Sequence, residues 1–166
     1  MSGFTHQRHK AYTPLPHPRP LVVAVPPLRS HVNLSRIVRT AGCCGVRRVI
    51  ACGRPRIDRQ IARNSVEYVR LETHRSLPPV LRSLREEGFQ LVGLEQTTGS
   101  ISLYEFRFPH RTALVLGHER QGMTDDVLGL LDVVVEIPVY GPPHSLNVAT
   151  AASIAMYEYC RQYPAG

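Results

Sequence analysis

The feature that most constrains the fold is a series of short apolar runs, rich in β-branched residues, that alternate with helix-like segments. Several of them, such as LVVAV and TALVLG, are apolar at every position that would face either side of a sheet. Strands buried on both faces and separated by helices are typical of parallel sheets. The sequence therefore predicts an α/β fold, a parallel sheet with helices on both faces. The expected strands are 21–25, 47–52, 67–72, 89–95, 112–117 and 133–137.

The segments between these runs predict helices at about 33–44, 76–88, 124–131 and 146–162, with 56–64 a short helix or loop and 97–106 a loop. Asn33 and Ser145 are suitable N-caps for the first and last of these helices. Gly88 is expected to end the second helix, because glycine readily adopts the left-handed conformation found there. Ligands of such sheets bind beyond the carboxyl ends of strands. The loops after Val25, Leu94, Leu116 and Ile137 are therefore the places to expect a site.

With 166 residues, the chain is predicted to form one domain, residues 21–163, preceded by a basic, proline-rich arm at 1–20. The arm has no apolar core of the kind that a secretory signal needs. No apolar run approaches the roughly 20 residues of a membrane-spanning helix. We therefore expect a cytoplasmic protein that is not bound to a membrane.

Charge is distributed unevenly along the chain. Residues 1–75 contain 14 Lys and Arg against 3 Asp and Glu, whereas residues 76–166 contain 6 against 10. The preference for arginine is also what a GC-rich genome produces, but this does not account for the asymmetry. A basic half favours binding to a polyanion such as RNA or DNA. The residues predicted to contact RNA are Arg8, Lys10, Arg19, Arg36, Arg47 and Arg48.

The four cysteines and eight histidines show no spacing typical of metal ligands, so no metal site is expected. Three segments contain residues that could take part in catalysis or binding, although each also has a structural explanation. Arg36 and Arg39 share a helix face that could simply be solvated, and Gly-His-Glu-x-x-Gly after the 112–117 strand could be a plain turn. The last segment enters a helix of small residues through Gly-Pro-Pro-His-Ser. The structural explanation of this last segment is a buried terminal helix.

Taken together and in this order, the segments NLSRIVRTAGCCG (33–45), LGHERQG (116–122) and IPVYGPPHSLNVATAASIAMYE (137–158) resemble the SpoU family of RNA ribose methyltransferases, within the SPOUT class. The resemblance covers about residues 20–163. It implies that the C-terminal segment threads through a loop to form a deep trefoil knot. Such knots are rare exceptions among folds. It also implies a homodimer with the site near the interface.

The resemblance further implies that S-adenosylmethionine binds in the knot and leaves as S-adenosylhomocysteine. The cofactor-binding residues would be Leu94, Leu116, Gly117, Ile137, Gly141, Ser145 and Leu146. The methyl group would pass to a ribose 2′-hydroxyl, with Arg39 as the catalytic residue. Because a guanidinium stays protonated at neutral pH, we expect Arg39 to position the hydroxyl and stabilise the developing alkoxide. The residues expected to orient Arg39, the ribose and the cofactor are Asn33, Glu119, Ser145 and Asn147.

The resemblance does not identify the RNA. Transfer RNA is favoured because the chain is compact, with the wobble position or the D-loop as candidate sites, and ribosomal RNA is the alternative. Three other functions are alternatives: a non-catalytic RNA-binding knot protein, a base methyltransferase of the same class and a nucleotide-dependent oxidoreductase. The complete set of matching polar residues argues against the first and Ser-Leu-Asn at 145–147 against the second. The missing G-x-G-x-x-G fingerprint argues against the third. His118, where many relatives have Asn, leaves the local cofactor contacts open.

Overall fold

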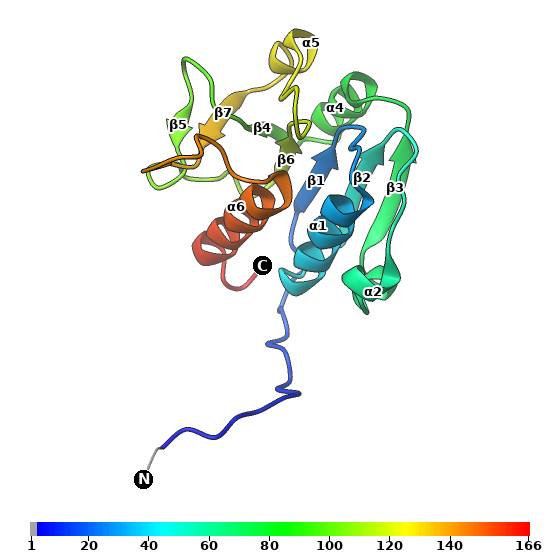
Figure 1. Ribbon diagram of the computed structural model, residues 1–166, viewed down its shortest axis with the longest axis vertical. Helices are drawn as coiled ribbons and strands as arrows, with labels where there is room; N and C mark the ends of the chain where they lie inside the picture. Colours follow the sequence, from blue (N-terminus) through cyan, green and yellow to red (C-terminus); the bar gives the residue numbers. More distant parts are fainter. Residues whose placement is uncertain (1–2) are drawn as a thin grey trace.

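The computed structural model describes residues 3–166, which form a seven-stranded sheet and six helices (Figure 1). Every pair of neighbouring strands is parallel, and the sheet order is β3-β2-β1-β6-β4-β7-β5. This confirms the predicted parallel α/β sheet. The strands are β1 (Leu21–Val25), β2 (Arg48–Cys52), β3 (Arg70–His74), β4 (Gln90–Leu94), β5 (Ile101–Ser102), β6 (Thr112–Leu116) and β7 (Val133–Glu136).

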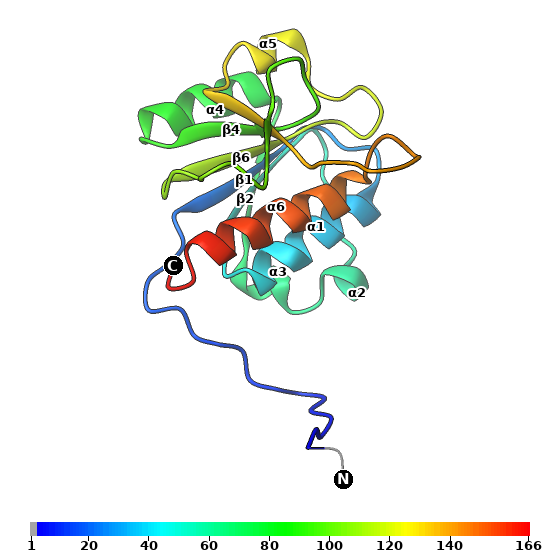
Figure 2. The ribbon, with the colours of Figure 1, turned by 90° about the vertical axis from the view of Figure 1, so that its left-hand side faces the viewer.

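The helices cover both faces of the sheet, as the apolar strands require. They are α1 (His31–Cys43), α2 (Arg59–Ala62), α3 (Ser65–Tyr68), α4 (Leu77–Glu86), α5 (Asp125–Leu128) and α6 (Val148–Gln162). Figure 2 shows α4 and α5 on one side of the sheet, and α1, α2, α3 and α6 on the other. None of the helices within residues 3–166 has the length and apolar character needed to cross a membrane.

The alternation of side chains along each strand divides the core in two. In β1, Leu21, Val23 and Val25 belong to the core beneath α1 and α6, whereas Val22 and Ala24 belong to the core beneath α4 and α5. All five are almost completely buried. A strand whose side chains pack into two cores in this way must be apolar at every position. This explains the uninterrupted apolar runs in the sequence.

The structure corrects several predicted boundaries. The strand expected at 67–72 lies at Arg70–His74, and the short helix α3 occupies 65–68. The loop expected at 97–106 contains β5, which forms only by pairing with β7. The helix expected at 124–131 is the single turn α5.

Both predicted N-caps were wrong. Ser30, not Asn33, caps α1, and its hydroxyl accepts a hydrogen bond from the backbone N–H of Asn33. Asn147, not Ser145, caps α6, and its side-chain oxygen Oδ1 accepts hydrogen bonds from the backbone N–H groups of Ala149 and Thr150. Both predicted caps were therefore misplaced by two or three residues, and two asparagine side chains, Asn33 and Asn147, lie together between the helices.

Residues 3–20 contain no regular helix or strand, in line with the expected extended arm (Figure 1). Its last part is nevertheless fixed to the domain. Arg19 is buried, and its guanidinium donates to the backbone oxygens of Cys44 (2.6 Å) and Tyr163, just beyond the ends of α1 and α6. Its burial and these two bonds argue against the prediction that Arg19 contacts RNA, because little of the side chain is accessible to a partner.

Candidate functional site

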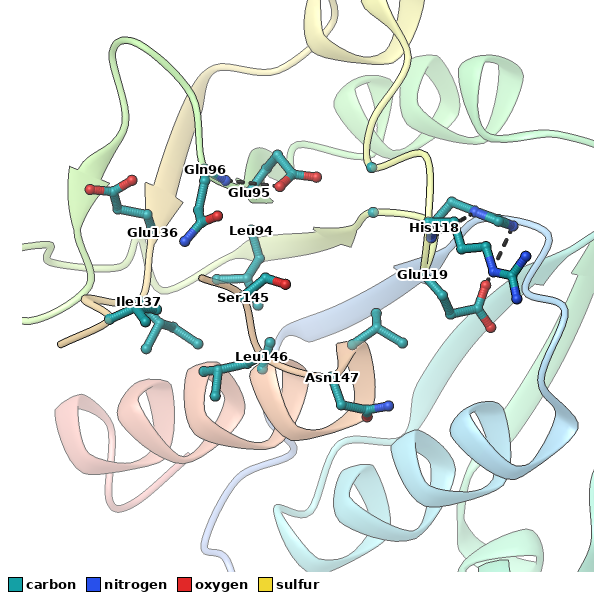
Figure 3. A pocket seen from close by; sticks show the side chains of 16 residues that line it. Leu94, Glu95, Gln96, His118, Glu119, Glu136, Ile137, Ser145, Leu146 and Asn147 are labelled. Atoms are coloured by element: carbon teal, nitrogen blue, oxygen red, sulfur yellow. Dashed lines mark hydrogen bonds and ion pairs between the residues drawn. The ribbon is translucent and has the colours of Figure 1, made fainter. Parts of the chain in front are cut away.

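A pocket of about 290 Å³ opens at the carboxyl ends of β4, β6 and β7 (Figure 3). These three strands are neighbours in the sheet, so the loops that follow them meet at one edge. This is the edge at which parallel sheets bind ligands. In Figure 3, Leu94, Glu95 and Gln96 lie on one side, Ser145, Leu146 and Asn147 on the other, and His118 and Glu119 at one end.

Most of the residues predicted to bind a cofactor line this pocket. Leu94, Gly117, Ile137, Ser145 and Leu146 are all part of its wall. Two are not. Leu116 is buried in the core beneath the loop, so its side chain cannot reach a ligand. Gly141 lies in a second hollow that shares Gln96, Glu136, Ile137 and Val139 with the first.

Two carboxylates in the wall, Glu95 and Glu136, were not among the predicted residues. Glu95 is the last residue of the strand predicted at 89–95, so its position at the edge of the sheet was foreseeable, but nothing local indicated where its side chain points. One of its oxygens accepts from the N–H of Gln96 at 2.9 Å. Glu136 accepts from the hydroxyl of Ser100 at 2.8 Å. The Gln96 side chain donates to the backbone oxygen of His144, which ties the β4 loop to the segment between β7 and α6.

The loop after β6 needs its glycines because Glu95 lies against it. A Cβ at Gly117 would come within 2.7 Å of a Glu95 carboxylate oxygen. A Cβ at Gly122, whose φ is +66°, would come within 2.8 Å of the same atom. The backbones of His118 and Gly122 close the loop with two hydrogen bonds of 3.0 Å. Side chains at either glycine would enter the pocket or displace Glu95.

His118 stabilises the same loop. Its Nδ1 accepts from the backbone N–H groups of Arg120 (3.2 Å) and Gln121 (3.3 Å), so this nitrogen carries no proton. The proton of the neutral ring is then on Nε2, which lies 3.4 Å from a carboxylate oxygen of Glu119. An asparagine oxygen could accept the same backbone bonds, so histidine at this position preserves the turn.

Three of the predicted site residues lie together beside the pocket. The Asn147 oxygen accepts from the α6 backbone, so its Nδ2 is the donor to the Asn33 oxygen, at 3.1 Å. The Asn33 amide in turn lies close enough to the Glu119 carboxylate to help lower its pKa. Each amide orientation is fixed, because backbone N–H groups only donate and a carboxylate only accepts. Asn33 is buried, and Glu119 has a side chain only 16% exposed.

Glu119 also holds the loop after β1. Its two oxygens accept from the backbone N–H groups of Arg29 (3.2 Å) and Ser30 (3.0 Å). Burial alone would raise the pKa of Glu119, but these bonds and that from Asn33 outweigh it and hold the pKa below its ordinary value. The carboxylate is therefore ionised at neutral pH, and its negative charge is fixed at the end of the pocket.

Arg39 does not join this group within one chain. It lies six residues after Asn33, which is about 9 Å along the helix and about 240° around it. Its side chain is exposed, and its guanidinium contacts the backbone oxygen of Ile61 in α2 at 3.4 Å. Asn33, Glu119, Ser145 and Asn147 are thus brought together by the fold, whereas Arg39 faces away from them.

Comparison with known proteins places this architecture in one family. The model of the SpoU rRNA Methylase family matches residues 20–157. The chain belongs to this family. Tyr159, Cys160 and the residues beyond complete α6 outside the matched range.

Relatives of this SpoU protein include tRNA (guanosine(18)-2′-O)-methyltransferase of Escherichia coli, which is 30% identical over 145 residues. That match covers 86% of this chain but only 63% of the relative, so this chain spans less than two thirds of the relative's length. Among solved structures, the TrmH/SpoU tRNA modifying enzyme of Aquifex aeolicus superposes with a TM-score of 0.82 at 29% identity, covering 88% of this chain and 76% of that one. The SpoU methyltransferase AviRb of Streptomyces viridochromogenes, solved with AdoMet, superposes with a TM-score of 0.78 at 26% identity, covering 92% and 64%.

The basic residues predicted to bind RNA fall into two groups in this SpoU chain. Arg8, Lys10, Arg36 and Arg47 are exposed and make no ion pair within residues 3–166. Arg48, by contrast, pairs with Glu72 at 2.9 Å and with Glu87 at 2.6 Å. Its hydrogen bond to Glu87, and then that to Glu72, raise its pKa further above the ordinary value. The prediction for Arg48 was therefore wrong, because it joins β2, β3 and the end of α4.

The described residues contain no group of three or more His, Cys, Asp or Glu side chains arranged to hold a metal ion.

Proposed function

We propose that this protein transfers a methyl group from S-adenosylmethionine to a ribose 2′-hydroxyl of RNA, most plausibly of tRNA. The observation that carries the proposal is the Asn147–Asn33 hydrogen bond beside the Glu119 carboxylate, at the end of the pocket after β4, β6 and β7. Family membership supports the reaction class, and the tRNA-modifying relatives from Escherichia coli and Aquifex aeolicus support the substrate.

The pocket suits S-adenosylmethionine. Leu94, Ile137 and Leu146 offer apolar surface and backbone groups to an adenine, and Gly117 permits close approach to the loop after β6. Glu95 and Glu136 add negative charge where a ligand with a sulfonium and an ammonium group would lie. AviRb, of the same family, was solved with this molecule. When bound, S-adenosylmethionine supplies a methyl group that is already activated by the positive sulfur. The expected trefoil knot remains part of this proposal.

Each polar residue then has a role in the substrate side of the site. Glu119 holds the loop after β1 through two backbone N–H groups, and Asn33 fixes its orientation. Asn147 anchors the start of α6, so that Ser145, two residues earlier, faces the pocket. Arg39, protonated at neutral pH, would hold the ribose hydroxyl and stabilise negative charge on its oxygen.

We further propose that the protein acts as a homodimer in which Arg39 serves the pocket of the partner subunit. Within one chain its guanidinium faces α2, not the pocket. The surface of the neighbouring helix α6 exposes Ile154 and Tyr157, which are 37% and 54% accessible. Exposed apolar side chains on the helix packed against α1, which carries Arg39, are well placed for an interface.

The test is methyl transfer from labelled S-adenosylmethionine to total tRNA and, separately, to ribosomal RNA. Arg39→Ala is compared with Arg107→Ala, an exposed arginine outside the pocket. We expect label in tRNA and resistance of the methylated linkage to alkali. Arg39→Ala should lose methyl transfer, and the Arg107→Ala control should retain it. Mixed dimers of Arg39→Ala and Glu119→Ala subunits should recover activity if Arg39 acts across the interface. Absence of label in both RNA pools, despite binding of the cofactor, would contradict the proposed reaction.

Ribosomal RNA is the second candidate substrate, because the matching family model is described by that RNA. Label confined to ribosomal RNA in the same experiment would keep the reaction and replace the substrate. We also propose a cytoplasmic location, where either RNA would be available.

A further inference from the structure

A second pocket, of about 190 Å³, lies between the loops that follow β1 and β2, at the start of α1. Three arginines, Arg29, Arg54 and Arg56, contribute to its wall, together with His31. Pro26, Leu34 and Cys52 contribute apolar surface. The proposed chemistry uses none of these four basic side chains.

The charge in this pocket is uncompensated. The guanidinium groups of Arg29, Arg54 and Arg56 form no ion pair or hydrogen bond with any other residue in 3–166. Asp58, which follows Arg56 by two residues, and Glu119, which bonds to the β1 loop, are both engaged elsewhere. Asp58 caps α2 through the N–H of Gln60 at 2.8 Å, and Glu119 accepts backbone bonds on the other side of the β1 loop. The first turn of the 13-residue helix α1 contains no acidic side chain, so its positive end adds to the field.

The backbone that carries these arginines is stiff. Pro26 and Pro27 follow β1, and Pro55 separates Arg54 from Arg56. Gly53 has φ of +83°, and a Cβ there would come within 2.8 Å of the Pro27 Cβ, so the two loops pack directly against each other. The backbone of this basic cleft is thus preformed, and its exposed arginine side chains are available to a ligand.

The β1 loop also contacts the pocket after β4, β6 and β7 through Glu119, which lines that pocket. Arg29 and Ser30 present their backbone N–H groups to Glu119, while the Arg29 side chain lines the basic pocket. A ligand held by the arginines would therefore lie next to the residues that the proposed reaction uses. It would also hold the loop on which the Glu119 contacts depend.

We propose that this pocket binds a backbone phosphate of the substrate RNA, next to the nucleotide that is methylated. The inference rests on the proposed function. Guanidinium groups match the geometry of phosphate oxygens and bind them through paired hydrogen bonds. At about 190 Å³ the cleft is smaller than the pocket proposed for S-adenosylmethionine, and its wall contains no Phe, Tyr or Trp on which a base could stack. A phosphodiester is the occupant that fits its size and charge.

The experiment uses the full-length protein and whichever RNA pool the wild type methylates. Arg54→Gln/Arg56→Gln is compared with Arg54→Lys/Arg56→Lys, which keeps the charge. A second control, Arg107→Gln, removes a positive charge close to Phe108, which bonds to Gln162 at the other end of α6. RNA affinity is measured at several salt concentrations, together with KM for RNA, kcat and the affinity for S-adenosylmethionine.

We expect the double Gln variant to bind RNA about tenfold more weakly, because charged hydrogen bonds to one phosphate are lost. The slope of log affinity against log salt should fall by about 0.7–1, the contribution of one phosphate contact. KM for RNA should rise, and cofactor affinity should stay unchanged. The Lys variant should retain most of the slope, and Arg107→Gln should match the wild type.

Inorganic phosphate distinguishes an RNA phosphate from a free one. At equal ionic strength, phosphate should displace RNA from the wild type better than chloride does, and this difference should vanish in the double Gln variant. Equal RNA affinity and slope in wild type and double variant would overturn the inference, as would an equal loss in Arg107→Gln. Phosphate binding at the pocket without any effect on RNA would also overturn it, in favour of a free-phosphate site. If the wild type methylated no RNA, the failure would belong to the proposed function instead.

Discussion

Replacing Glu119 by glutamine tests whether a single carboxylate holds the loop after β1 in place. Glutamine has nearly the same shape but only one acceptor oxygen. In the wild type, one oxygen accepts from the N–H group of Arg29 and the other from that of Ser30, with the Asn33 amide close by. After the substitution, one of these two backbone N–H groups must face an NH₂ group. The loop after β1 should therefore lose one hydrogen-bond acceptor, and its remaining hydrogen bond should be to a neutral oxygen instead of a charged one.

The size of the effect follows from those contacts. A partly buried N–H left without an acceptor costs about 1–3 kcal/mol, and a remaining bond that loses its charge weakens by about 1 kcal/mol. The Arg29 N–H is exposed and can bond to water, so the lower part of this range applies. We expect Glu119→Gln to lower the free energy of unfolding by about 2 kcal/mol at pH 7. For a chain of this length, this corresponds to a Tm lower by about 4–8 °C.

The pH dependence provides an independent check. The pKa of Glu119 is lowered in the folded protein, so the stability that its charge contributes is present above the ordinary carboxyl pKa of about 4.3. It is lost as the pH falls through the lower, folded-state pKa. The difference in stability between wild type and Glu119→Gln should be constant from pH 8 to about pH 5 and should narrow below that.

Urea unfolding followed by circular dichroism at several pH values measures both effects. Glu105→Gln is the matched control, since Glu105 is exposed and makes no ion pair within residues 3–166, and it should change stability by less than about 0.5 kcal/mol. A stability of Glu119→Gln equal to that of the wild type at pH 7 would refute the reasoning. So would a difference that persists undiminished well below pH 4.

Two further substitutions test other parts of the structure. Asn147→Ala should lower the free energy of unfolding by about 2 kcal/mol, half from the lost N-cap of α6 and half from the unpaired Asn33 oxygen. Asn147→Ser, which keeps a capping oxygen, should lose only about half as much in the same urea titration. Arg19→Ala should cost about 3 kcal/mol, because two backbone oxygens at the helix ends lose a charged donor. Its affinity for RNA, measured where both proteins are folded, should equal that of the wild type; weaker RNA binding at unchanged stability would restore Arg19 to the RNA-binding set.

The parts of the fold that could be predicted are those with a local signal. Strands such as β1 and β6 feed two cores and must be apolar throughout, so their residues alone indicate them. β5 could not be found in this way, because its two residues become a strand only by pairing with β7. At the start of α1 the sequence predicted Asn33 as the cap, whereas the structure uses Ser30. The choice between them depends on Glu119, 89 residues after Ser30, which fixes the backbone of the loop.

The site shows the same division. Asn33, Glu119 and Asn147 come from three distant segments, and no periodicity relates them; the family resemblance, not the residue pattern, indicated that they belong together. Arg19 and Arg48 look like their basic neighbours in the sequence. Only the folded chain places carbonyl oxygens around the first and carboxylates beside the second. Charge in the sequence therefore indicates a basic half, but not which of its arginines remain available after folding.

The helix of small residues at the end of the chain connects these observations. Ala149, Ala152 and Ala155 are buried, and the Ser153 hydroxyl lies 2.9 Å from that of Thr40, so α6 can lie close against α1 (Figure 2). This close approach brings the Asn147 amide within reach of Asn33, because each amide lies at the same end of its helix. Larger side chains on α6 would separate the helices and break the link to Glu119. The packing of the two helices and the alignment of the site are thus one set of contacts, and a substitution such as Ala152→Leu should impair both together.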